Sequence, residues 1–283
     1  MAPTLSAGSL VRRTVQRNFM ALSRGLLPLA AMLALVGLDV RAESITDARY
    51  VSPVERYGHF ALGRPHEYAG LTATTSAGRT LTLRLPEDDV FEDLAPRIVR
   101  LTPTQPPEIL AIVSNRRSGS RLVLIRSNRE GLAIAAQSSA IGTPMRWLNP
   151  VGVADLDGDG LAEIAAVITP HVGGTLKVYR RREGKLVEIA ALPGFSNHVL
   201  GSRELSLSAP VSIAGSSFVL VPDTARVNLR VIALAGDRLV EKGRCALSAP
   251  VTGGIEPVSP HEISIGLASG RRVIDPKACM RNE

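Results

Sequence analysis

Cysteine is scarce in this chain, with only Cys245 and Cys279 among 283 residues. They do not form a Cys-x-x-Cys pair, and neither has a histidine beside it in the sequence, which argues against a redox dithiol and an activated thiol nucleophile. In an oxidising compartment two cysteines form a structural bridge more often than a metal site. We therefore expect a Cys245–Cys279 disulfide, with two buried free thiols as the alternative.

Aromatic side chains are also few, at 4% of the chain, and Trp147 is the single tryptophan. Little surface is therefore left for stacking on sugar rings. The Gly-x-Ser-x-Gly elbow and the Gly-x-x-x-x-Gly-Lys phosphate loop are missing, so acyl and phosphoryl transfer have no visible machinery. These absences favour a binding protein over an enzyme.

Positive charge is concentrated in residues 1–42, and the remainder carries 28 basic and 25 acidic residues, a net charge of +3. This balance does not indicate a nucleic-acid partner. The first 42 residues have the parts of a secretory signal: arginines, the apolar stretch Gly25–Leu38, and small residues at Val40 and Ala42. The apolar stretch has about 14 residues, whereas a membrane span needs roughly 20. We expect cleavage before Glu43, no stable span afterwards and a periplasmic or secreted protein; an uncleaved anchor is the alternative, and the export route stays open.

Short apolar and β-branched runs recur through the rest of the chain between Gly, Pro, Asn and Asp clusters, as is typical of strands joined by tight turns. No segment after residue 45 has a long helical period. The expected fold is therefore all-β. The runs are residues 71–75, 81–85, 109–113, 122–125, 164–168, 176–179, 186–190, 219–221 and 229–232.

An internal repeat organises these strands. Asp155–Glu163, followed by an apolar run, aligns without gaps with three other segments, and the following strands begin near residues 108, 163, 218 and 262. Intervals of 55, 55 and 44 residues suit one four-stranded propeller blade each. We expect a single β-propeller domain over residues 43–283, with repeats near 96–149, 150–203, 204–249 and 250–283.

The length of the chain predicts five blades, and four blades is the second choice. Residues 50–95 would supply the N-terminal blade or the closing strands. Pairing between N-terminal and C-terminal strands would close the ring and hide both sheet edges.

The segment Val151-Gly-Val-Ala-Asp-Leu-Asp-Gly-Asp-Gly-Leu-Ala-Glu-Ile resembles the repeat of the bacterial FG-GAP/VCBS family, whose members resemble the integrin β-propeller. The resemblance covers roughly residues 90–270 and implies a calcium loop between the first and second strands of a blade. Three of the four repeats depart from the three-aspartate pattern: the replacements are Arg100, Thr102 and Thr104; Pro210, Ser212 and Ala214; and Gly254, Glu256 and Val258.

The acidic loop has the chemistry of a calcium site. Carboxylates at alternate positions can converge on one hard cation if the chain curls, and Gly158 and Gly160 permit the curl. The expected oxygen ligands are Asp155, Asp157, Asp159, the Leu161 carbonyl and Glu163. An EF-hand would need glutamate where this chain has Ala166, and an acidic turn without metal is the remaining alternative.

Antiparallel strand order places the turns on two opposite faces. The face opposite the calcium loop collects polar segments that form our candidate binding surface. Ordinary turns use the same residue types, which is the alternative. The candidate residues are Arg146, Trp147, Asn149, His171, Asn197, His198 and Arg203.

These features together predict an exported, calcium-binding β-propeller that acts as a binding or scaffolding module in the cell envelope. Its partner would be an envelope protein or a glycan, which the sequence does not identify. A carbohydrate-active enzyme or sugar-binding protein on the same fold is the alternative.

Overall fold

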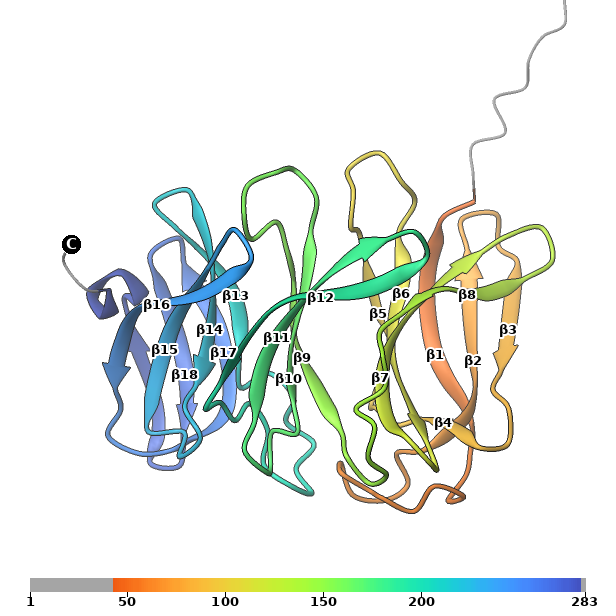
Figure 1. The fold of residues 1–283 in the computed structure, drawn as a ribbon, viewed down its shortest axis with the longest axis horizontal. Helices are drawn as coiled ribbons and strands as arrows, with labels where there is room; N and C mark the ends of the chain where they lie inside the picture. The colour runs from red at the N-terminus through yellow and green to blue at the C-terminus, as the bar shows by residue number, and fades with distance from the viewer. Residues whose placement is uncertain (1–42, 281–283) are drawn as a thin grey trace, which may run out of the picture. The chain divides into compact units, whose positions relative to one another are not determined.

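Short strands joined by turns make up residues 43–280, the part of the chain that the structure, a computed structural model, describes. The expected signal peptide, residues 1–42, lies outside the described residues. The described residues contain no α-helix, so the all-β expectation is confirmed (Figure 1). No helix among them is long and apolar enough to cross a membrane.

The strands fall into five groups that are consecutive in the chain. They are β1 (Ile45–Pro53), β2 (Tyr68–Thr75), β3 (Thr80–Arg84) and β4 (Asp89–Phe91); β5 (Arg97–Val99), β6 (Glu108–Asn115), β7 (Gly119–Ser127) and β8 (Leu132–Gln137); β9 (Leu148–Ala154), β10 (Glu163–Ile168), β11 (Thr175–Arg182) and β12 (Lys185–Pro193); β13 (Ala209–Ile213), β14 (Ser216–Pro222), β15 (Asn228–Ala235) and β16 (Arg238–Ala246); and β17 (Val251–Ser259), β18 (Glu262–Leu267) and β19 (Gly270–Ile274). A short 3-10 helix, η1 (Pro276–Cys279), follows β19.

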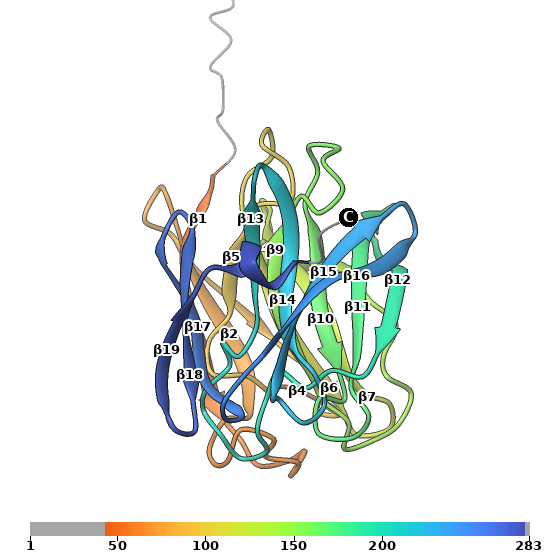
Figure 2. The same cartoon turned by 90° about the vertical axis from the view of Figure 1, so that its left-hand side faces the viewer.

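Within each of the last four groups, neighbouring strands pair antiparallel in chain order. The first three groups form one strongly curled twelve-stranded sheet, because β4 bridges β2 and β6 and a single parallel pair, Gln137 with Lys185, joins β8 to β12. The other two groups are separate sheets of four and three strands (Figure 2).

Apolar side chains pack between successive groups. One cluster joins the first group to the second, another the second to the third, and two more continue to the last group. The inner strands β6 and β10 are buried over almost their whole length, whereas β12 alternates between buried and exposed residues. An inner strand covered on both faces reads as a continuous apolar run, which is why the sequence revealed β6 and β10 clearly.

The expected ring closure through strand pairing is not formed. Among residues 43–280, no strand of the group β17–β19 pairs with β1–β4. The outer strand β19 has an exposed surface that carries Arg271 and Arg272. Charged side chains on such an edge discourage pairing with other strands.

Candidate functional site

The acidic loop connects β9 to β10, at the end of the sheet opposite the 54–67 segment (Figure 1). Gly158 and Gly160 have φ angles of 81° and 85°, in the left-handed region that glycine enters without strain. These two residues let the chain curl at the place where the sequence predicted a curl. The loop therefore brings its side chains close together over a short stretch of exposed backbone.

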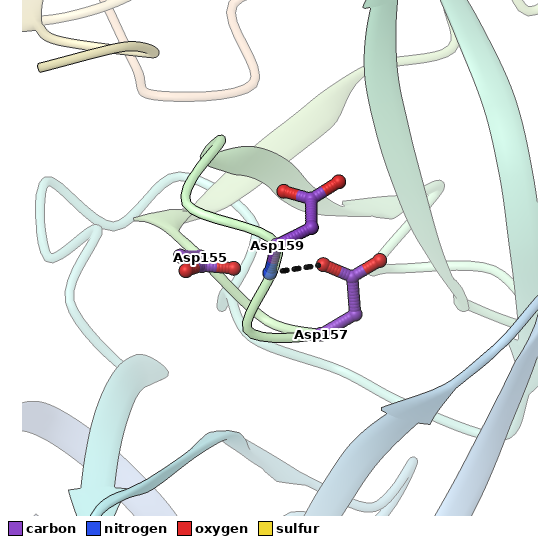
Figure 3. Close-up of side chains that lie close together, drawn as sticks. All are labelled: Asp155, Asp157 and Asp159. Atoms are coloured by element: carbon purple, nitrogen blue, oxygen red, sulfur yellow. Dashed lines mark hydrogen bonds between the residues drawn. The ribbon is translucent and has the colours of Figure 1, made fainter.

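Three aspartates meet inside this curl (Figure 3). One carboxylate oxygen from each of Asp155, Asp157 and Asp159 lies within 4.8 Å of the others. Backbone N–H groups of Gly158 and Gly160 donate to the two oxygens of Asp155 at 2.8 and 2.9 Å. These backbone groups thus hold the Asp155 carboxylate in place without adding charge, and an all-oxygen donor set of this kind suits a hard cation.

Glu163 lies at the base of the loop and has a different set of partners. The side chain is fully buried; one oxygen accepts the Leu156 N–H at 3.0 Å and the other accepts Nε of Arg180 at 2.9 Å. Burial raises the pKa of Glu163, and the hydrogen bonds from Leu156 and Arg180 oppose that shift. Leu161 is 46% exposed and donates its N–H to Asp159. Glu163 therefore anchors the loop and lies outside the group of three aspartates.

Arg180 on β11 links this anchor to the loop. Its guanidinium also contacts the Asp157 carboxylate at 2.5 Å. The next residue of β11, Arg181, pairs with Glu108 at the start of β6 in the neighbouring group. Strand β11 therefore supplies the arginine partner of both aligned glutamates, one in its own group and one in the neighbouring group, which the sequence alignment of Glu108 with Glu163 did not reveal.

The other repeats have no comparable acidic turn. Thr102 and Gln105 form a local hydrogen bond in the β5–β6 connection. Residues 210–213 belong to β13 and residues 254–258 to β17, so the chain there is extended instead of curled. Among residues 43–280, the three aspartates are the only group of three or more His, Cys, Asp or Glu side chains with ligand atoms this close.

At the opposite end, the structure brings together three of the residues predicted for the binding face. Nε2 of His171 lies 2.7 Å from Nδ1 of His198, and both rings contact Trp147. Nε2 of His198 lies 3.0 Å from the Ser202 carbonyl, which can only accept a hydrogen bond. His198 in its neutral form therefore carries its proton on Nε2 and accepts the His171 N–H at Nδ1.

Both histidines are held in the neutral form. Burial lowers the pKa of each to about 4. Smaller contributions are included in these values: His198, His59 and Arg226 lower the pKa of His171, and Arg226 lowers that of His198, whereas the hydrogen bond to Ser202 and the charge of Glu204 raise that of His198. At neutral pH the pair is a hydrogen-bonded couple without charge.

The remaining predicted residues divide into two kinds. Asn149 and Asn197 are fully buried and exchange side-chain to backbone hydrogen bonds at 3.1 and 3.2 Å, so they join β9 to the 194–208 connection. Arg146 contributes its carbonyl to Ser120, and Arg203 is exposed. The two arginines therefore do not join the histidine pair.

Sequence reasoning missed a buried polar chain behind Trp147. The indole N–H donates to the Glu92 carbonyl at 2.9 Å, and the fully buried Glu92 carboxylate binds His59 at 2.9 Å and Ser114 at 2.7 Å. His59 comes from a loop 33 residues away in the chain, and residue spacing does not predict that it meets Glu92.

Close backbone packing holds the two histidine loops together. A Cβ atom on Gly174 would lie 1.9 Å from the Phe195 carbonyl oxygen, and the Gly174 carbonyl accepts the N–H groups of Gly194 and Phe195. We expect Gly174→Ala to destabilise the protein by about 2–3 kcal/mol, because the loops must separate. Gly173→Asn is the control, since Gly173 has φ of 64° and open space around it. Thermal denaturation checks this, and equal melting temperatures for the two variants would contradict it.

A cavity of about 360 Å³ lies away from both sites, between β8 and β12. Its wall includes Tyr179, Lys177 and one carboxylate, Glu188, which pairs with Lys177 at 2.7 Å. Two carboxylates flanking a bond are the usual requirement for glycoside hydrolysis, and this wall does not supply them.

Comparison with known proteins adds no family assignment: no protein-family model matches the chain, and no curated protein matches it.

Proposed function

We propose that this chain is an exported, calcium-binding β-propeller, similar to FG-GAP/VCBS repeat proteins, that serves as a binding or scaffolding module of the cell envelope. The observation that carries the proposal is the turn between β9 and β10, where three aspartate oxygens lie within 4.8 Å of one another. Calcium prefers such a set of carboxylate oxygens on a flexible loop.

Two further observations support the propeller and the exported location. Successive antiparallel groups pack through apolar clusters in the order of the chain, as blades do. The Cys245–Cys279 disulfide is typical of proteins that fold in an oxidising compartment. Trp147 is only 1% exposed, so it offers no stacking surface to a sugar, and a binding module is favoured over the carbohydrate-active alternative.

Calcium is expected to stabilise the protein. Binding to the folded state alone adds about 2.7 kcal/mol when free calcium is about one hundred times Kd, which corresponds to roughly 5–10 °C in Tm for a domain of this size. Calorimetric titration should give one tight site, and chelation should remove the shift in Tm. Magnesium should substitute poorly, since it requires strict octahedral geometry and retains water.

Asp157→Ala is expected to remove most of this calcium dependence. Because the substitution also breaks the contact with Arg180, the quantity to compare is the difference in Tm with and without calcium, not Tm itself. Asp159→Asn is a second variant, since the Asp159 side chain only accepts a local N–H. Thr102→Ala, in the aligned loop without acids, is the control. A full calcium response in both aspartate variants would refute the site.

A further inference from the structure

We propose that His171 and His198 form a second metal site, which takes a divalent first-row transition metal such as zinc, nickel or copper. The two imidazoles lie at the end of the fold opposite the acidic loop and come from the β10–β11 turn and the connection after β12. Imidazole nitrogen suits these metals, whereas calcium prefers oxygen. The proposal is therefore independent of the proposed calcium function.

The distance between the rings is close to that in a two-histidine metal site. Nε2 of His171 and Nδ1 of His198 are 2.7 Å apart. Two imidazole nitrogens on one tetrahedral zinc ion, each about 2.0–2.1 Å from the metal, lie about 3.3 Å apart. A separation that is larger by about 0.6 Å would seat the ion between the two nitrogens, and neutral His171 would then carry its proton on Nδ1 instead of Nε2.

His198 is already oriented as a ligand. Its Nε2–H donates to the Ser202 carbonyl at 3.0 Å, which leaves the lone pair of Nδ1 pointing at His171. A second-shell hydrogen bond to a backbone carbonyl is the usual means of fixing the tautomer of a metal-binding histidine. The His198 residue is fully buried, so its ring is held in place.

His171 can supply the movement that the ion requires. It is half-buried on a short turn, beside Val172, which is 61% exposed. Thr169 and Gly173 bound this turn with φ angles of 50° and 64°. The turn therefore gives solvent access to one side of the pair, and water would complete the coordination of the metal.

The charged neighbours are of both signs. Arg226, which donates to Ser196 at 3.1 Å, disfavours a cation, as does His59 when it is protonated, while Glu204 near His198 favours one. The Glu204 carboxylate therefore offsets part of the Arg226 charge at the pair.

Trp147 supplies the readout because it is the only tryptophan in the chain and its ring centroid lies 6.1 Å from that of His171, nearly parallel to it. Nickel or copper bound to the pair should quench tryptophan fluorescence in a saturable way with one equivalent of metal. The titration uses tag-free mature protein in saturating calcium, so that the acidic loop is occupied, and is repeated after chelation and dialysis. Quenching in both conditions is expected.

His171→Ala and His198→Ala should each weaken this binding at least tenfold, while His261→Ala, which removes an exposed histidine, should leave it unchanged. His171→Gln is included in case an alanine variant loses its fold, as judged by circular dichroism. Absence of saturable quenching in the wild type, or wild-type affinity in both His171 variants, would overturn the metal site. If the protein binds no calcium but nickel or copper still quenches its tryptophan fluorescence, only the proposed calcium function is refuted.

Discussion

Replacing both cysteines, as Cys245→Ser with Cys279→Ser, is expected to lower the free energy of unfolding by about 4 kcal/mol, the value for releasing a closed loop of this length. The bridge joins residues 34 positions apart, on β16 and in η1. The strands β17–β19 lie within the closed loop, so the disulfide ties the last sheet to its neighbour. Urea denaturation of the variant and of the oxidised wild type measures the difference.

This last sheet depends on the bridge because, among residues 43–280, its apolar cluster is shared with the β13–β16 group alone. It contacts the β13–β16 sheet through a single apolar cluster, which includes Cys279. Reduction of the wild type should reproduce the loss in the variant, and reductant should not affect the variant. Gly243 packs directly against the Cys279 backbone, with space for no Cβ. If the packing of Gly243 against Cys279 holds the last sheet in place without the bridge, the free energy of unfolding will fall by less than about 1 kcal/mol. The proposed stabilising role of the disulfide would then be wrong.

The sequence predicted the inner strands best. Strands β6, β10 and β18 begin at residues 108, 163 and 262 as expected, and β14 begins two residues before the expected position 218. Strands β6, β10 and β14 are largely buried and contain unbroken apolar runs, whereas β18 alternates isoleucine with Ser264 and Gly266. The outer strand β16 contains Arg238, Glu241 and Arg244 and has no such run, because one of its faces meets solvent. Its pairing depends on β15, which local sequence does not reveal.

The site was predictable where chemistry is local and not where it depends on distant contacts. The aspartates are neighbours in sequence, and the glycines between them dictate the turn. The disulfide followed from the number of cysteines, and the structure confirms it. By contrast, the Arg180 partner of Glu163 comes from another strand, and the His59 partner of Glu92 lies 33 residues away. Residue spacing gives no sign of such pairs.

Glu67→Ala is expected to destabilise the protein by roughly 3–5 kcal/mol, because several N–H groups would lose their acceptor at once. The fully buried carboxylate accepts N–H groups from four consecutive residues, 57–60, at distances of 3.2, 3.1, 3.0 and 3.4 Å. The backbone wraps around it, with φ angles of 76° at Gly58 and 49° at Phe60. Thermal and chemical denaturation measure the loss.

The same substitution should loosen the 54–67 segment before the rest of the protein unfolds, so limited proteolysis should cut there first. Glu67→Gln should have an intermediate effect, since the amide keeps one acceptor oxygen and turns an NH₂ group toward two of the donors. Glu55→Ala is the matched control: Glu55 is in the same segment, but its ion pair with Arg64 is exposed, and its loss should change stability by less than about 1 kcal/mol. Because Ala61 and Leu62 of this segment pack in the apolar cluster around Trp147, loosening it should also shift tryptophan fluorescence. If Glu67→Ala is no more destabilising than Glu55→Ala, water replaces the carboxylate at these N–H groups and Glu67 does not organise the segment.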